Sequence, residues 1–152
     1  MRKLKCILPL LLSVGILQAA IPFTGKWKMN HQKSKYTKGN APKDETMDVS
    51  DQGEVLHVTI SGTNEDGTPI SITYVVPVGG GSGQMERNGA YNGVTSNRVN
   101  DRTRDTTYTK DGRQAAAEHM VVDTGGDTMT LAIRGTDSEG NPVDGVLVFD
   151  RE

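Results

Sequence analysis

Cysteine is almost missing from this sequence. Its only cysteine, Cys6, lies within the first twenty residues, so a domain that begins after them has no disulfide bond. Small secreted domains that cannot build a hydrophobic core usually depend on disulfides. A chain of 152 residues is long enough to bury a sizeable core without them. We therefore expect a single domain that is stabilised by apolar packing.

An excess of positive charge is also absent. Lysine and arginine total 17, against 19 aspartate and glutamate residues, which gives a formal net charge of −2. Proteins that bind nucleic acids take much of their affinity from a basic surface. The composition therefore argues against a nucleic-acid partner.

The N-terminus has the pattern of a signal peptide. A basic segment, Met1–Lys5, precedes an apolar run over residues 6–17, and the small residues Ala19 and Ala20 follow. The apolar run spans 12 residues, whereas a membrane-spanning helix needs about 20. We expect a signal peptide over residues 1–20, cleaved near Ala19 or Ala20, and a secreted or periplasmic mature protein without a membrane anchor. Loss of the three basic leader residues would change the net charge from −2 to −5.

After the leader, apolar residues recur with a period of two, and no window shows a sustained helical period. This alternation predicts half-buried strands, and the short glycine-containing turns between them predict antiparallel hairpins. We therefore predict an all-β fold, an antiparallel up-and-down meander that forms a lipocalin-like barrel over residues 21–152. The eight or nine strands are expected near residues 23–29, 45–50, 54–61, 69–78, 94–100, 103–110, 113–122, 128–135 and 143–151.

Two stretches fit this pattern less well. Gly79–Gly83 is a glycine-rich connector that forms either a loop over the barrel mouth or a seam between two halves of the meander. Ala115–Met120 has helical propensity, but the Asp-Gly turn before it and the two valines after it favour a strand.

One turn pattern occurs twice. The segment Ile60–Ile70 aligns with Ile133–Val143, and both contain Gly-Thr, an acidic turn with glycine, and then proline. These residue types suit tight turns for their own reasons. Duplication of half a barrel and convergence on one turn chemistry both explain the match.

The first predicted strand carries a recognisable motif. The segment Phe23–Asn30 reads Phe-Thr-Gly-Lys-Trp-Lys-Met-Asn, and Lys-Ser-Lys follows at residues 33–35. With the repeated turns, this start resembles the lipocalin-like domains of the calycin group, most of all small bacterial secreted proteins of uncharacterised function. The resemblance implies that Trp27 is a structural residue of the barrel floor and that Arg151, or else Arg134, lies against it in a cation–π contact.

A barrel of about eight strands has an interior that is either filled by side chains or holds one small ligand. Tyr74, Tyr108, Arg98 and Arg104 lie on middle strands, where an inward side chain could orient the polar end of a ligand; outward, solvated positions for these four are equally open. The apolar lining of such a pocket would consist of Leu56, Val58, Ile60, Ile72, Met129, Leu131 and Ile133.

No residue set indicates catalysis, a metal or a cofactor. His31, His57 and His119 lack the spacing of zinc ligands. The acidic turns at residues 123–127 and 137–139 lack the pattern of a calcium loop. The glycine-rich connector likewise lacks the Lys-Ser/Thr of a phosphate loop.

We expect a non-catalytic protein that binds a small hydrophobic or amphipathic molecule inside the barrel. One open alternative is a solid-cored barrel or sandwich that acts as an envelope structural or protein-interaction module. The other is an enzyme on the same scaffold, which would require His57 or His119 to face a carboxylate or an arginine inside the barrel mouth.

Overall fold

The computed structural model describes residues 20–87, 91–137 and 140–152, and this part of the chain contains twelve β-strands and no helix. The predicted all-β antiparallel barrel is confirmed, but the predicted count of eight or nine strands is wrong. The predicted signal peptide lies outside the described residues, except for Ala20. The strands are β1 (Gly25–Met29), β2 (Lys35–Lys38), β3 (Pro42–Asp51), β4 (Val55–Asn64), β5 (Pro69–Pro77), β6 (Gly81–Ser82), β7 (Gln84–Arg87), β8 (Gly93–Asn100), β9 (Thr103–Lys110), β10 (Arg113–Val122), β11 (Thr128–Thr136) and β12 (Pro142–Arg151).

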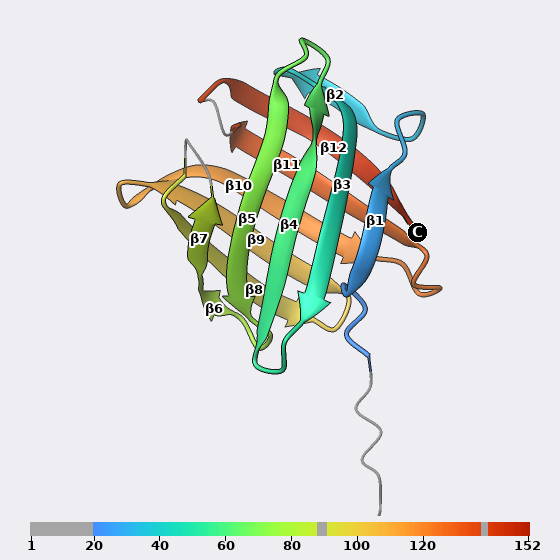
Figure 1. The fold of residues 1–152 in the computed structure, drawn as a ribbon, viewed down its shortest axis with the longest axis vertical. Helices are drawn as coiled ribbons and strands as arrows, with labels where there is room; N and C mark the ends of the chain where they lie inside the picture. The colour runs from blue at the N-terminus through green and yellow to red at the C-terminus, as the bar shows by residue number, and fades with distance from the viewer. Residues whose placement is uncertain (1–19, 88–90, 138–139) are drawn as a thin grey trace, which may run out of the picture.

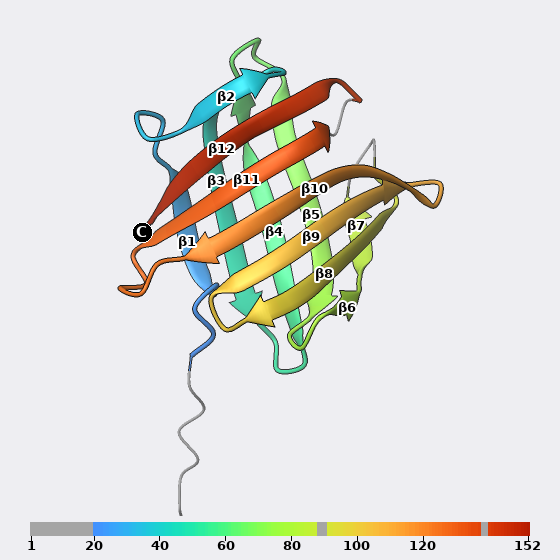
Figure 2. The same ribbon diagram turned by 180° about the vertical axis from the view of Figure 1, so that it is seen from behind.

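The sheet is a meander that curls round until its last strand meets its first (Figure 1, Figure 2). Strands that follow one another along the chain pair as antiparallel neighbours through most of the sheet, as short hairpin connections require. β12 then pairs with β1, and Trp27 lies opposite Arg151 in this ladder. The order around the barrel is β6-β8-β9-β10-β11-β12-β1-β3-β4-β5-β7.

The two ends of this order meet at a seam between β5 and β8. Here β7 pairs with β5 and β6 pairs with β8, and Gly83 alone separates the two short strands. The Gly83 amide donates to the Val94 carbonyl at 2.9 Å, and a Cβ atom at Gly83 would lie 2.1 Å from the Val75 carbonyl oxygen. Only glycine fits between the two strands at this point. Of the two interpretations of Gly79–Gly83, the structure therefore shows the seam.

Three strands were not predicted: β6 and β7 at the seam, and β2 in the polar stretch between β1 and β3. β2 pairs with β12 beyond the end of β1, with Tyr36 opposite Gly145. A Cβ atom at Gly145 would lie 2.9 Å from the Tyr36 ring, so this glycine gives the ring its space. Within the described residues β2 forms no ladder with β3, and Figure 1 shows the two strands diverging.

Alternation along the strands places one row of side chains inside the barrel. On β4 this row is apolar, with Leu56, Val58 and Ile60 all buried. β9 is different, because its inward row consists of Arg104, Thr106 and Tyr108. The interior is therefore mostly apolar, with buried polar side chains along β9 and at Glu45, Ser96 and Glu118.

Trp27 and Arg151 close one end of the barrel. The Trp27 ring is fully buried, and its Nε1 donates to the Phe23 carbonyl at 2.8 Å. The guanidinium of Arg151 lies over that ring and donates to three backbone carbonyls, those of Gly126, Thr24 and Pro22, at 2.5 to 2.7 Å. These bonds tie the last strand to the segment before β1 and to the turn between β10 and β11.

The two hairpins with matching sequences also match in geometry. In the β4–β5 hairpin the Asn64 amide donates to the Thr68 carbonyl at 2.8 Å, and in the β11–β12 hairpin Asp137 donates to Asn141 at 2.9 Å. The glycine of each Gly-Thr pair lies against a neighbouring strand: Gly62 against β3 and Gly135 against β10. A Cβ atom would meet a backbone carbonyl oxygen at 2.1 Å at Gly62 and at 2.2 Å at Gly135. The repeated Gly-Thr therefore serves close strand packing as well as the turn.

Candidate functional site

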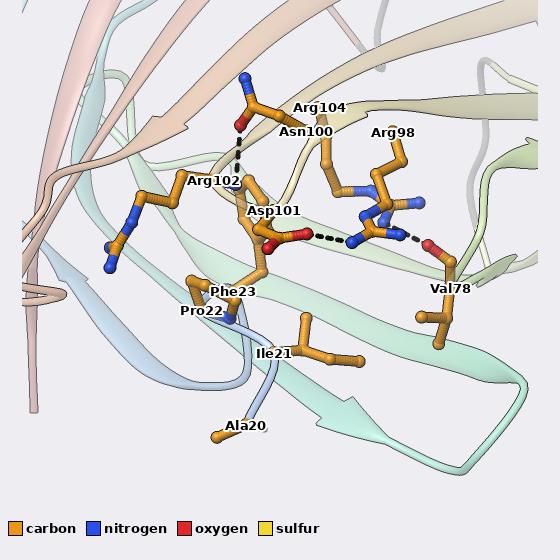
Figure 3. A pocket seen from close by; sticks show the side chains of 10 residues that line it. All are labelled: Ala20, Ile21, Pro22, Phe23, Val78, Arg98, Asn100, Asp101, Arg102 and Arg104. Carbon is orange, nitrogen blue, oxygen red and sulfur yellow. Dashed lines mark hydrogen bonds and ion pairs between the residues drawn. The ribbon is translucent and has the colours of Figure 1, made fainter. Parts of the chain in front are cut away.

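A groove of about 350 Å³ lies at the closed end of the barrel, between the segment that precedes β1 and the turn that joins β8 to β9 (Figure 3). Its volume falls within the range of about 300 to 1,000 Å³ that is typical of small-molecule pockets. Ten residues line it: Ala20, Ile21, Pro22, Phe23, Val78, Arg98, Asn100, Asp101, Arg102 and Arg104.

Arg104 forms the inner wall of this groove. It is 3% exposed, and its guanidinium donates to the Ser96 hydroxyl at 3.1 Å and to the carbonyls of Val78 and Pro77 at 2.9 Å each. All three acceptors are neutral, and no carboxylate of the described residues forms an ion pair with it. Burial lowers the pKa of the Arg104 guanidinium, but an arginine remains cationic at neutral pH. The groove therefore has a buried positive charge without a counter-ion from the protein.

Two further arginines stand at the rim. Arg98 forms an ion pair with Asp101, and its side chain is 46% exposed. Arg102 donates from Nη1 to the Asp123 carbonyl, and its backbone amide donates to Asn100 Oδ1 at 2.9 Å. The lining thus holds three guanidinium groups and a single carboxylate, on a chain whose net charge is −2.

The opposite wall is apolar. Ile21, Pro22 and Phe23 line it, whereas Val78 lies beside Arg104 and accepts its hydrogen bond (Figure 3). Thr24 fixes the chain segment before β1 in place, because its amide and its hydroxyl donate to the Ile21 carbonyl at 3.0 and 2.7 Å. An apolar wall facing Arg98 and Arg104 suits a molecule that has both an apolar part and an anionic group.

The predicted apolar lining residues fill the interior instead of surrounding a large cavity. Leu56, Val58, Ile60, Met129 and Leu131 are buried in one core cluster with Tyr74 and Tyr108, and Ile72 and Ile133 pack against it. About 20 Å³ remains free in the middle of the barrel, and about 60 Å³ remains toward the mouth. These spaces can hold a small group or a few water molecules, but not a drug-sized ligand.

The structure separates the four polar candidates. Tyr74 and Tyr108 are buried in the core, with ring centroids 5.8 Å apart in an edge-to-face arrangement. Arg104 is buried as well and borders the groove, whereas Arg98 is exposed at its rim. The groove thus brings Arg98 and Arg104 together and leaves the two tyrosines outside it.

Sequence reasoning missed two sets of residues. Arg102 and the apolar segment at residues 20–23 gave no signal, because a turn and a chain segment come together there only in three dimensions. Glu45 and Glu118, which are both buried at the mouth, did leave a signal. Each is an acidic residue in the inward phase of its strand, two positions before a buried methionine.

Two of the histidines lie beside carboxylates outside the barrel interior. His57 Nε2 lies 3.2 Å from Glu86 Oε2, and His119 Nδ1 lies 2.6 Å from Asp105 Oδ1, with all four side chains at least 30% exposed. Neither pair lies inside the mouth, where the enzyme alternative requires one. Among the described residues, no three histidine, cysteine, aspartate or glutamate side chains converge as a metal site would need. In the same part of the chain, no helix has the length and apolar character needed to cross a bilayer.

No protein-family model matches the sequence, and no curated protein matches it either. Among solved structures, the chain is similar to a redesigned β-barrel, mFAP1, bound to DFHBI, with 13% identity, a TM-score of 0.46, and coverage of 86% of this chain and 95% of the other. It is also similar to EF1p2_mFAP2b bound to DFHBI, with 14% identity, a TM-score of 0.48, and coverage of 86% and 94%. At these values the likeness carries no argument about the function of this chain.

Proposed function

We propose that this chain is an exported, non-catalytic binding protein and that its ligand is a small amphipathic anion held in the groove at the closed end of the barrel. The observation that carries the proposal is Arg104, a buried cation without a carboxylate partner that borders a groove of ligand size. A buried charge is costly unless it is paired, so an anionic group on a ligand would supply what the protein does not.

The apolar wall defines the rest of the ligand. Ile21, Pro22 and Phe23 would cover a short hydrocarbon or ring, while Arg98 approaches the anionic group from the rim beside Arg104 (Figure 3). A ligand in this place binds at the end of the barrel. This differs from binding inside the barrel, where the packed core leaves only small spaces.

We also infer a relationship to the secreted lipocalin-like proteins of the calycin group. Gly25 and Trp27 at the start of the first strand, and Arg151 over the tryptophan ring, support it. Gly25 has a specific reason to be glycine: its φ is +121°, and a Cβ atom there would lie 2.6 Å from Arg151 Nη1. The motif and the arginine therefore depend on each other sterically.

Titration calorimetry with octanoate as the probe tests the proposed function. We expect octanoate to bind, 1-octanol of the same length to bind much more weakly, and Arg98→Gln to weaken octanoate binding about tenfold, the loss expected for one charged hydrogen bond. Arg134→Gln is the matched control, because Arg134 is an exposed arginine on the outer wall that pairs with Asp144. Equal affinity for octanoate and octanol, or equal losses in both variants, would contradict the proposal.

The packed core also favours a second function. A solid-cored barrel could act as an envelope structural or protein-interaction module, and the small free volumes of 20 and 60 Å³ are what such a barrel would have. Absence of octanoate binding, together with capture of a defined envelope partner that is lost on mutation of exposed residues such as Val146, would support this alternative.

A further inference from the structure

The mouth of the barrel, at the end opposite the arginine groove, contains a second and chemically different cavity. It measures about 60 Å³ and lies beside the turns of the two matching hairpins. Glu45 on β3 and Glu118 on β10 face it, together with the rings of Tyr36, Tyr91 and Tyr108. In Figure 1 the β4–β5 turn that borders this mouth and the segment before β1 that borders the groove lie at opposite ends of the molecule.

The two carboxyl groups are buried without a cation. Glu45 is 8% exposed and its carboxyl group has no hydrogen-bond partner among the described residues, while Glu118 is 7% exposed and accepts a hydrogen bond from the Tyr108 hydroxyl at 3.0 Å. The described lining of the cavity contains a third acid, Asp137, but no lysine, arginine or histidine. Neither Glu45 nor Glu118 forms an ion pair with a lysine, arginine or histidine of the described residues.

The protonation of the surrounding groups sets the charge of the cavity. Burial, and then the charge of Glu118, raises the pKa of Glu45 to about 8, and burial raises that of Glu118 to about 7 although the Tyr108 hydrogen bond opposes it. The hydroxyl groups that face the carboxyls also have raised pKa values, because burial and the nearby acids disfavour their ionisation; these are Tyr36 on β2, Tyr91 before β8, and Tyr108 on β9. The cavity therefore becomes negatively charged only as the two glutamates lose their protons above about pH 7, and it then favours a positively charged guest.

The aromatic rings add to this preference. Tyr91 and Tyr108 are stacked, with centroids 4.9 Å apart and planes at 17°, and the Tyr91 hydroxyl is anchored on the Thr136 carbonyl. The face of an aromatic ring attracts a cation, and the attraction grows when water is excluded. A neutral apolar guest would gain neither this attraction nor that of the carboxylates.

A larger depression adjoins the cavity on its outer side. It measures about 430 Å³, lies between β2 and β3, and shares Tyr36, Pro42 and Leu147 with the lining of the cavity. No ladder joins β2 to β3 in the described chain, so no backbone hydrogen bond between these two strands would have to break for a narrow molecule to pass beside the Tyr36 ring. The inner cavity has room for only a few atoms, whereas the outer depression has room for an alkyl chain.

We propose that this cavity binds the ammonium end of a small primary alkylamine, with the two buried carboxyls and the tyrosine rings around the nitrogen and the alkyl chain leaving between β2 and β3. A primary ammonium fits the small volume, and its three N–H donors match the carboxylate oxygens. The proposal is independent of the groove, which lies at the other end of the barrel and carries the opposite charge.

Titration calorimetry of the whole protein with butylammonium tests the proposal, with 1-butanol as the neutral molecule of equal length. We expect butylammonium to bind at least about tenfold more tightly than butanol at about pH 9, and at least about tenfold more weakly at about pH 6 than at about pH 9. The amine is protonated at both pH values, whereas the carboxyls lose their protons between them. Equal binding of the two molecules, or no pH dependence, would overturn the proposal.

Glu118→Gln should weaken butylammonium binding about tenfold or more and leave octanoate binding in the groove unchanged. Glu86→Gln is the control, because Glu86 is an exposed acid on the outer wall. If the Glu118 variant does not fold, NMR titration of the carboxyl carbons in the unmodified protein replaces it. Saturating butylammonium should then lower the pKa of Glu45 or Glu118 by about one unit or more, and unchanged values would overturn the assignment.

Discussion

The guanidinium of Arg151 lies over the indole ring of Trp27, with Cζ 4.0 Å from the ring centroid, while the two residues face each other in the β1–β12 ladder. One side chain therefore combines ring stacking with hydrogen bonds to three carbonyls, two in the segment before β1 and one in the turn between β10 and β11. This relationship fixes the closed end of the barrel.

Arg151→Lys keeps the charge and removes the planar fork that reaches the three carbonyls. We expect a loss of about 1–3 kcal/mol in the free energy of unfolding, because buried acceptors lose their donors. Urea unfolding followed by the fluorescence of Trp27, the only tryptophan, measures it. Arg134→Lys on the exposed wall should change stability by less than about 0.5 kcal/mol. Equal effects of the two substitutions would show that Arg151 is not an anchor.

Gly83→Ala tests the seam. The new Cβ atom would lie 2.1 Å from the Val75 carbonyl oxygen, so β5 and β8 must separate locally. Forcing a side chain into a packed site costs about 1–3 kcal/mol, and we expect the midpoint of thermal unfolding to fall accordingly. Gly79→Ala is the control, since it lies in the same connector with nothing within 4 Å of its added Cβ atom and should be neutral or slightly stabilising. If Gly83→Ala leaves the midpoint of thermal unfolding unchanged, the strands at the seam are not closely packed at this position.

The buried acids predict an unusual dependence of stability on pH. An acid whose pKa is higher in the folded than in the unfolded protein favours folding at low pH and loses that advantage as the pH rises. For Glu45 the pKa rises from the ordinary value of 4.5 to about 8. The free energy of unfolding should therefore decrease between about pH 4.5 and pH 8 and become level above that range. Each unit of pKa difference corresponds to about 1.4 kcal/mol. Urea unfolding at a series of pH values measures the slope.

Glu45→Gln removes the ionisable group and should flatten this profile, so that the variant is more stable than the unmodified protein at about pH 9. The exposed Glu54→Gln serves as the control and should keep the original slope. A profile that rises from about pH 5 to pH 8 would contradict the burial of these carboxyls.

Arg104→Met tests the role of the buried guanidinium in ligand binding. Methionine leaves the carbonyls of Pro77 and Val78 and the Ser96 hydroxyl without their donor, so we expect the free energy of unfolding to fall by about 1–3 kcal/mol. Octanoate binding by the folded variant should fall below detection. Unchanged octanoate binding would show that these bonds of Arg104 have a structural role alone.

The long strands could be predicted because their alternation is local. The predicted ranges 103–110 and 113–122 coincide with β9 and β10, including the alanine-rich stretch with helical propensity. β2, β6 and β7 could not be predicted in this way. They have four, two and four residues, which is too short to show an alternation of their own. In addition, β2 pairs with β12, more than a hundred residues away, and β6 and β7 form only where the barrel closes at its seam.

The site was harder to predict than the fold. Arg104 could be proposed because it lies on a middle strand, but the groove beside it depends on a chain segment more than seventy residues away. Alternation shows that a side chain points inward; it does not show whether inward side chains leave a cavity, which depends on how their volumes interlock. For the same reason, the sequence shows that Glu45 and Glu118 point inward, but it does not show which side chains surround them.

The pairing of β12 with β1 also determines when the barrel can close during synthesis. Arg151 and Thr24 are 127 residues apart in the chain, yet they are joined by a hydrogen bond at 2.5 Å. During synthesis the first strand has to wait for the last one, so a growing chain cannot close its ring early. We expect newly made chains to remain loose and sensitive to proteases until the final strand has been released from the ribosome.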